Sequence, residues 1–126
     1  MTIIPGLARD VDAVDHQEAL HAGGRTFAVL GSGVDRTYQP GRRALAAQLV
    51  EHGVLISDYA PETPPDASNF PTRLRIVSGL SIAVVVVEAG ESSDAMVTAQ
   101  FAADPGREVF AVQAASWRCK AWAPAV

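Results

Sequence analysis

The residues best suited to bind an anion stand in three short stretches of this 126-residue chain. Arg73 and Arg75 lie two positions apart, and arginine offers forked N–H donors that match a phosphate group. Ser93 belongs to a Ser-Ser-Asp turn of helix-capping residue types before a periodic segment, where the first turn of a helix presents N–H groups to anions. A Gly31-Ser32-Gly33 bend, followed by Arg36, comes after an apolar run. These residue types and spacings predict contacts with phosphate groups.

The glycine bend and the arginine pair each have a plainer interpretation. The dinucleotide fingerprint G-x-G-x-x-G is not met, because Arg36 stands where its third glycine belongs. A tight turn that lets the backbone leave the sheet is therefore favoured over a phosphate loop. On a regular helix, Arg73 and Arg75 would point about 200° apart, so one of the two can be a solvated surface charge.

The capping turn and the aromatic side chains each allow a structural and a functional interpretation. Ser93 can simply cap its helix, and the neighbouring Asp94 would compete with a phosphate for the same N–H groups. Tyr38, Tyr59 and Phe70 are of the type that stacks on unpaired bases. Packing in the core is the more frequent fate of such rings, and we expect it for Phe70.

Nothing in the sequence indicates a catalytic centre. Asp12 and His16 are four residues apart and could form a hydrogen bond on one helix face, but no nucleophile motif accompanies them. A structural role for this pair is favoured. The sequence lacks H-E-x-x-H and paired Cys/His spacings and has a single cysteine, Cys119. We therefore predict a protein that is not an enzyme, with no metal, no cofactor and no internal disulfide.

The overall charge limits the kind of partner. The net charge is −4 and the pI is about 5.2, which argues against a strongly basic nucleic-acid binder. Several arginines nevertheless sit in or beside loops that a parallel sheet could bring together, so a local basic patch is compatible with an acidic chain. No apolar run approaches the roughly 20 residues of a membrane span. Together with the lone cysteine and the lack of a signal peptide, this predicts a cytoplasmic protein.

These candidate residues must be positioned by alternating strands and helices. Ile82–Val87 is wholly apolar and contains four consecutive valines, so we expect a central strand buried on both faces, as in a parallel sheet. The order of elements predicts right-handed β-α-β units and an α/β fold. The expected strands are 2–4, 26–30, 54–57, 82–88 and 108–112; the expected helices are 11–22, 42–52 and 96–104, with one or two helical turns over 73–78 after a loop at 58–69.

Four blocks of the chain carry a family resemblance. They are FPTRLRIVSGLS at 70–81, with VVEA at 86–89 and SDAMVTA at 93–99; GLARDVD at 6–12, followed by His16; AVLGSGVD at 28–35, followed by Tyr38; and GREVFAV at 106–112. In this order they resemble the Rossmann-like domain of the DprA/Smf family of bacterial DNA-processing proteins. The resemblance covers about residues 4–112, and the blocks together are specific although each alone is weak.

The chain also departs from that pattern. Leu74 replaces the family's Asn between the two arginines, and Asp94 replaces its Gly after Ser93. The family has an earlier strand–turn–helix unit with a G-S-R-type loop, which nothing here matches. We therefore expect a Rossmann-like parallel sheet with flanking helices that lacks the first strand–helix unit and leaves an exposed edge. Residues 1–113 are predicted to form this partial domain, and residues 114–126 a tail outside the family pattern.

The resemblance implies a protein that binds single-stranded DNA and passes it to a RecA-type recombinase in natural transformation, acting as a homodimer. The expected nucleic-acid-binding residues are Arg73, Arg75, Ser93, Gly31, Gly33 and Arg36. One alternative is a nucleotide-binding sensor or phosphoribohydrolase-like domain of the same superfamily, although the P-G-G-x-G-T loop of those hydrolases is absent. The other is a fragment without function of its own.

Overall fold

Strands and helices alternate along the chain in the computed structural model, which describes residues 1–5, 11–36, 43–87 and 94–112. The predicted parallel α/β architecture is confirmed, and most boundaries lie within two residues of those predicted. Among the described residues, no helix combines the length and apolar character needed to cross a bilayer. In chain order the elements are β1 (Thr2–Ile3), α1 (Val11–His21), β2 (Arg25–Val29), α2 (Arg43–His52), β3 (Gly53–Ile56), α3 (Asn69–Leu80), β4 (Ala83–Val86), α4 (Asp94–Ala103) and β5 (Glu108–Ala111).

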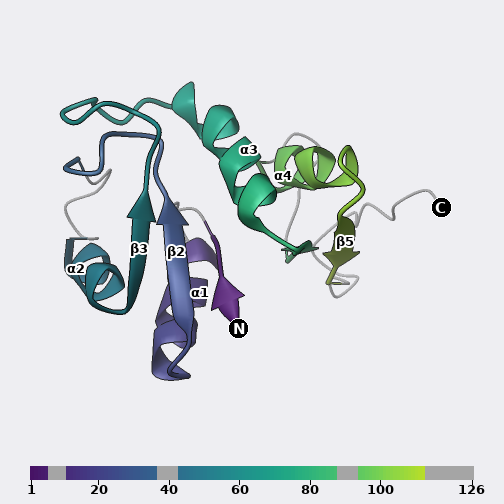
Figure 1. The fold of residues 1–126 in the computed structure, drawn as a ribbon, viewed down its shortest axis with the longest axis horizontal. Helices are drawn as coiled ribbons and strands as arrows, with labels where there is room; N and C mark the ends of the chain where they lie inside the picture. Colours follow the sequence, from purple (N-terminus) through teal and green to yellow (C-terminus); the bar gives the residue numbers. More distant parts are fainter. Residues whose placement is uncertain (6–10, 37–42, 88–93, 113–126) are drawn as a thin grey trace, which may run out of the picture.

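The first three strands form one parallel sheet in the order β1-β2-β3. Alternate residues of β2 and its extension, Ala28 and Leu30, are buried with Leu45 and Leu49 of α2. Helices α1 and α2 both pack against this sheet (Figure 1). Because successive side chains of a strand point to opposite faces, this apolar set fixes which face of β2 meets the helices.

The last two strands form a separate two-stranded parallel sheet, β4-β5. The prediction that 82–88 is a central strand buried on both faces is therefore wrong. The strand covers Ala83–Val86 only, Val85 is 59% exposed and Ile82 is almost fully exposed. Within the described residues no strand pairs with the free edge of β4, so its valines are shielded only where α4 packs.

Helix α3 is longer than the one or two turns predicted over 73–78. It runs from Asn69 to Leu80, and it begins at the last residue of the expected loop, four residues before the predicted turns. Pro71 stands in the first turn, where the N–H that proline lacks has no helical partner in any case. The N–H groups of Asn69 and Phe70 donate to the carbonyls of Asp66 and Ala67. Because α3 contacts both β2 and α4, it joins the two sheets (Figure 1).

Candidate nucleic-acid interface

The loops that follow β2 and β3 meet the start of α3 at the carboxyl ends of the parallel strands. The Leu30 N–H donates to the Ile56 carbonyl at 2.8 Å, which extends the ladder by one residue before the two loops diverge. The Asn69 side-chain amide then donates to the Gly31 carbonyl at 2.9 Å. The Ser57 hydroxyl donates to the Ser32 carbonyl at 2.6 Å. This edge is where ligands bind in open parallel sheets.

At Gly33 the glycine bend packs closely against the loop at 60–63. The Gly33 N–H donates to the Thr63 carbonyl at 3.0 Å. A Cβ added at Gly33 would lie 2.7 Å from both the Ala60 carbonyl oxygen and an Asp35 carboxylate oxygen. That carboxylate accepts the Glu62 N–H at 2.8 Å, and Glu62 has a positive φ of 67°. Gly33 therefore closes a tight turn against 60–63, which supports the plainer of its two readings; phosphate contact at Gly31 and Gly33 stays a prediction.

Arg73 lies inside the molecule and not on its surface. Its side chain is 2% exposed, one Nη lies 3.4 Å from the Val29 carbonyl, and Cζ stands 4.5 Å from the centroid of the Phe70 ring. The Val29 carbonyl and the face of the Phe70 ring each help to stabilise this buried guanidinium. Arg73 thus fastens α3 to β2. Its predicted phosphate contact stays a prediction.

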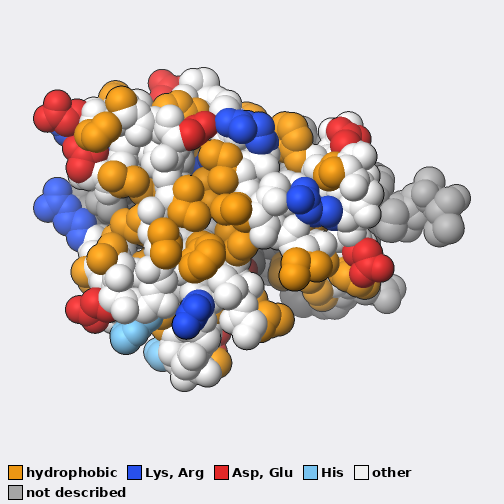
Figure 2. All heavy atoms as spheres, in the orientation of Figure 1, with side chains coloured by type: hydrophobic (Ala, Val, Ile, Leu, Met, Phe, Trp, Pro, Cys, Tyr) orange, Lys and Arg blue, Asp and Glu red, His pale blue; other side chains and the backbone are white. Residues whose placement is uncertain are grey.

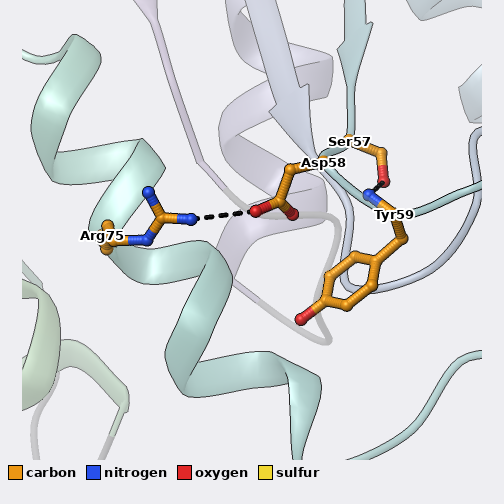
Figure 3. A network of polar contacts seen from close by, with 4 residues as sticks. All are labelled: Ser57, Asp58, Tyr59 and Arg75. Carbon is orange, nitrogen blue, oxygen red and sulfur yellow. Dashed lines mark hydrogen bonds and ion pairs between the residues drawn. The ribbon is translucent and has the colours of Figure 1, made fainter.

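Arg75 points the other way and is accessible. Its side chain is 57% exposed, and one Nη lies 2.9 Å from a carboxylate oxygen of Asp58, itself 39% exposed. Figure 3 shows Arg75 reaching from α3 to Asp58 in the segment after β3, next to Tyr59, whose N–H donates to the Ser57 hydroxyl. Exposed ion pairs contribute only about 0–1 kcal/mol, so an incoming phosphate can compete with Asp58. The divergence predicted for the two arginines is confirmed.

Arg36 is the second accessible arginine at this edge. Its side chain is exposed, and its carbonyl accepts the Ser32 hydroxyl at 2.6 Å, which holds its backbone against the bend. No ion pair joins it to a carboxylate among the described residues. In Figure 2, Lys and Arg side chains form separate spots around a central apolar area instead of a continuous basic band.

Some predicted site residues fall outside the described part of the chain. Ser93 and Tyr38 do so, and their predicted roles stay predictions. Tyr59 and Phe70 are both half-buried. Phe70 lies beneath the Arg73 guanidinium, which agrees with the packing role expected for it.

His16 has a structural role, as favoured from the sequence. The side chain is fully buried, and its Nδ1 lies 2.7 Å from the Thr26 hydroxyl oxygen. The same hydroxyl lies 3.1 Å from the Ile3 carbonyl oxygen, to which it can donate. The bonds link α1, β2 and β1. No group of three or more His, Cys, Asp or Glu within the described ranges could hold a metal.

Sequence reasoning missed three residues that organise this edge: Asn69, Asp58 and Asp66. Asp66 precedes α3, and one of its carboxylate oxygens accepts the Ser68 hydroxyl at 2.6 Å and the Ser68 N–H at 2.7 Å. Both bonds lower the pKa of Asp66 below its ordinary value of 3.8, and the bond from the Ser68 hydroxyl has the larger effect. A usable signal was available for Asp58, which follows a strand directly and so stands at the ligand-binding edge. Burial raises the pKa of Asp15 on α1, away from these loops.

Comparison with known proteins places these features in context. The family model described as DNA recombination-mediator protein A matches residues 1–121. Protein Smf of Escherichia coli is 51% identical over 114 residues, 89% of this chain and 30% of that protein. Protein Smf of Synechocystis is 44% identical over 111 residues, 88% of this chain and 28% of that protein. The DNA processing protein DprA of Bacillus subtilis is 42% identical over 110 residues, 87% of this chain and 37% of that protein.

A solved structure agrees with these sequence matches. The X-ray structure of DNA processing protein A from Streptococcus pneumoniae superposes with a TM-score of 0.85 and 35% sequence identity, over 94% of this chain and 42% of that one. The chain thus spans about a third of the length of the curated relatives it matches.

Proposed function

Because the chain belongs to the DNA recombination-mediator protein A family, whose members are the DprA/Smf DNA-processing proteins, we propose that it binds single-stranded DNA through its sugar–phosphate backbone. The binding edge is the carboxyl end of β2 and β3 together with the exposed side of α3. The observation that carries this proposal is Arg75, an accessible guanidinium that forms an exposed ion pair with Asp58.

Arg75 and Arg36 are the phosphate contacts we propose among the described residues. Each guanidinium can replace its present contacts with a phosphate at little cost in free energy, because neither arginine is buried. Arg73 acts as a positioning residue that keeps α3, and with it Arg75, in place above β2. The N–H groups near Ser93 and Gly31 stay proposed contributors, and Tyr59 is the candidate for stacking on a base.

Such an interface predicts weak, salt-dependent binding. Each phosphate neutralised by a cation changes log K by about −0.7 per unit of log salt for a single strand. Two arginine contacts therefore give a slope of about −1.4. Because so few contacts hold the strand and each weakens as salt is added, low salt is needed to observe binding. The net charge of −4 opposes binding at long range and keeps the affinity low.

The protein's recombinase partner, oligomeric state, location and lack of enzymatic activity are also proposals. We propose that the bound strand is passed to a RecA-type recombinase in natural transformation, that the protein acts in the cytoplasm as a homodimer, and that it is not an enzyme. The description of the matching family as a recombination mediator supports the first of these.

Fluorescence anisotropy with a labelled oligothymidylate, measured across a salt series, tests the proposal. We expect Arg75→Ala and Arg36→Ala each to weaken binding and to reduce the salt slope by about 0.7. Arg25→Ala is the matched control, because Arg25 is exposed but begins β2 at the opposite end of the sheet. No binding by folded protein at low salt, or equal losses in all three variants, would remove the proposal. Competition by a mononucleotide equal to that by the oligonucleotide would instead favour a nucleotide sensor.

A further inference from the structure

One face of the two-stranded sheet carries apolar side chains that no described element covers. Val85 and Phe110 are partners across β4 and β5, so their side chains share a face, and they are 59% and 52% exposed. By alternation Val87 and Val112 continue this face and are also exposed. Val84, on the opposite face, is buried near α4. A parallel sheet is normally covered on both sides, so this set, the apolar β4–β5 face, needs a partner.

The chain supplies a candidate for this partner directly after β5. Residues 113–126, QAASWRCKAWAPAV, follow Val112 and contain Trp117 and Trp122, the only tryptophans of the protein. A packed aromatic side chain of this size buries about 150–250 Å². An extended chain advances about 3.3 Å per residue, so Trp117 can reach about 17 Å from Val112. That distance exceeds the length of β4, about 13 Å for four residues.

Charge also favours this occupant. Glu108 lies on the same face, because its partner Ala83 is two residues from Val85. Arg118 and Lys120 stand between the two tryptophans in the sequence. A segment that places indole rings over the valines therefore brings a cation within reach of the Glu108 carboxylate, whereas a second copy of this face would bring a second Glu108.

We propose that residues 113–126 fold back onto the apolar β4–β5 face of the same molecule, with Trp117 and Trp122 packing against Val85 and Phe110. This goes beyond DNA binding and does not depend on it. Tethering gives the segment an effective concentration in the millimolar range, so a contact too weak to hold a free peptide is still populated. The consequence is that an aggregation-prone face is closed without a second protein.

Tryptophan fluorescence of the full chain reports on this segment alone, since it holds both tryptophans. We expect Val85→Asp to shift the emission maximum to the red and to increase quenching by acrylamide. Val50→Asp is the matched control, because Val50 is 63% exposed on α2. Val54→Asp on β3 tests docking on the other sheet. The spectra are recorded over a hundredfold range of protein concentration.

The proposal requires a red shift with Val85→Asp only, independent of concentration. Unchanged emission in Val85→Asp, or a shift with Val54→Asp alone, would overturn it. A shift that grows with dilution of the parent protein would assign the face to a second copy instead.

A second measurement covers the case in which Val85→Asp unfolds β4. In a Val85→Cys variant, a short bis-maleimide should join the new thiol to Cys119, the only natural cysteine, within one chain. The Val50→Cys variant should give no such intrachain product. Equal cross-linking in both variants, or none in either, contradicts docking on this face.

Discussion

Replacing Asp58 by asparagine should strengthen the binding of single-stranded DNA. Asp58 is the group that competes with a phosphate for Arg75, since its carboxylate lies 2.9 Å from the Arg75 guanidinium. Asparagine has nearly the same shape but no charge. The substitution therefore frees Arg75 and removes a negative charge from the proposed path of the DNA backbone.

The size of the gain follows from the exposure of the pair. An ion pair this open to solvent is worth about 0–1 kcal/mol, and that is the energy a phosphate no longer has to replace. Removing the repulsion between a carboxylate and a phosphate about 8 Å apart in water adds about 0.5 kcal/mol before salt screening. With about 1.4 kcal/mol per factor of ten, we expect an affinity about two- to tenfold higher at low salt.

The assay is anisotropy with a labelled oligothymidylate for the parent chain, Asp58→Asn, Arg75→Ala and the double variant. If Asp58 acts by occupying Arg75, the ion-pair part of the gain disappears in the Arg75→Ala background, and the double-mutant cycle gives a coupling energy of the size of that part. Only the gain from the lost repulsion, about 0.5 kcal/mol, remains without Arg75. Glu18→Gln, an exposed carboxylate on α1, controls for net charge. An equal gain in Glu18→Gln, or a full gain without Arg75, would refute the reasoning.

Three further predictions concern the frame of the interface. Arg73→Ala should lower the free energy of unfolding by about 2–4 kcal/mol in urea titrations, because it removes a buried guanidinium and leaves a cavity beside Phe70; a normal unfolding curve combined with lost DNA binding would make Arg73 a direct contact. Gly33→Ala should cost about 1–3 kcal/mol in thermal unfolding, because its Cβ would press on the Ala60 carbonyl, and an unchanged melting temperature would contradict that crowding. The pKa of Asp66 is lowered in the folded state, so its stabilisation is present above the ordinary value of 3.8 and is lost as the pH falls through the lowered pKa. Asp66→Asn should therefore flatten the acid limb of the stability–pH curve, and an identical limb in both proteins would show that the Ser68 bonds carry no weight.

Much of the architecture was predictable because it depends on local patterns. Apolar runs located the strands, and the 3.6-residue period located α1 and α2, since burying one face of each element requires that order of residues. The helical turns predicted over 73–78 were too short because they began after Pro71, although proline is well tolerated in the first turn of a helix. The prediction that strand 82–88 is buried on both faces was wrong for another reason. Four consecutive valines indicate that a strand has apolar faces, but they do not show whether other parts of the chain pack on those faces.

The sequence by itself determined the parallel α/β class, the family resemblance and the opposite directions of Arg73 and Arg75, because each follows from residue order and the geometry of one helix. Only the tertiary structure decided which arginine is buried and which is accessible. That choice depends on where α3 packs on β2, and on residues 17 and 44 positions away in sequence, Asp58 for one arginine and Val29 for the other. Long-range contacts of this kind leave no local pattern, because a carbonyl or a carboxylate accepts a guanidinium wherever the fold places it.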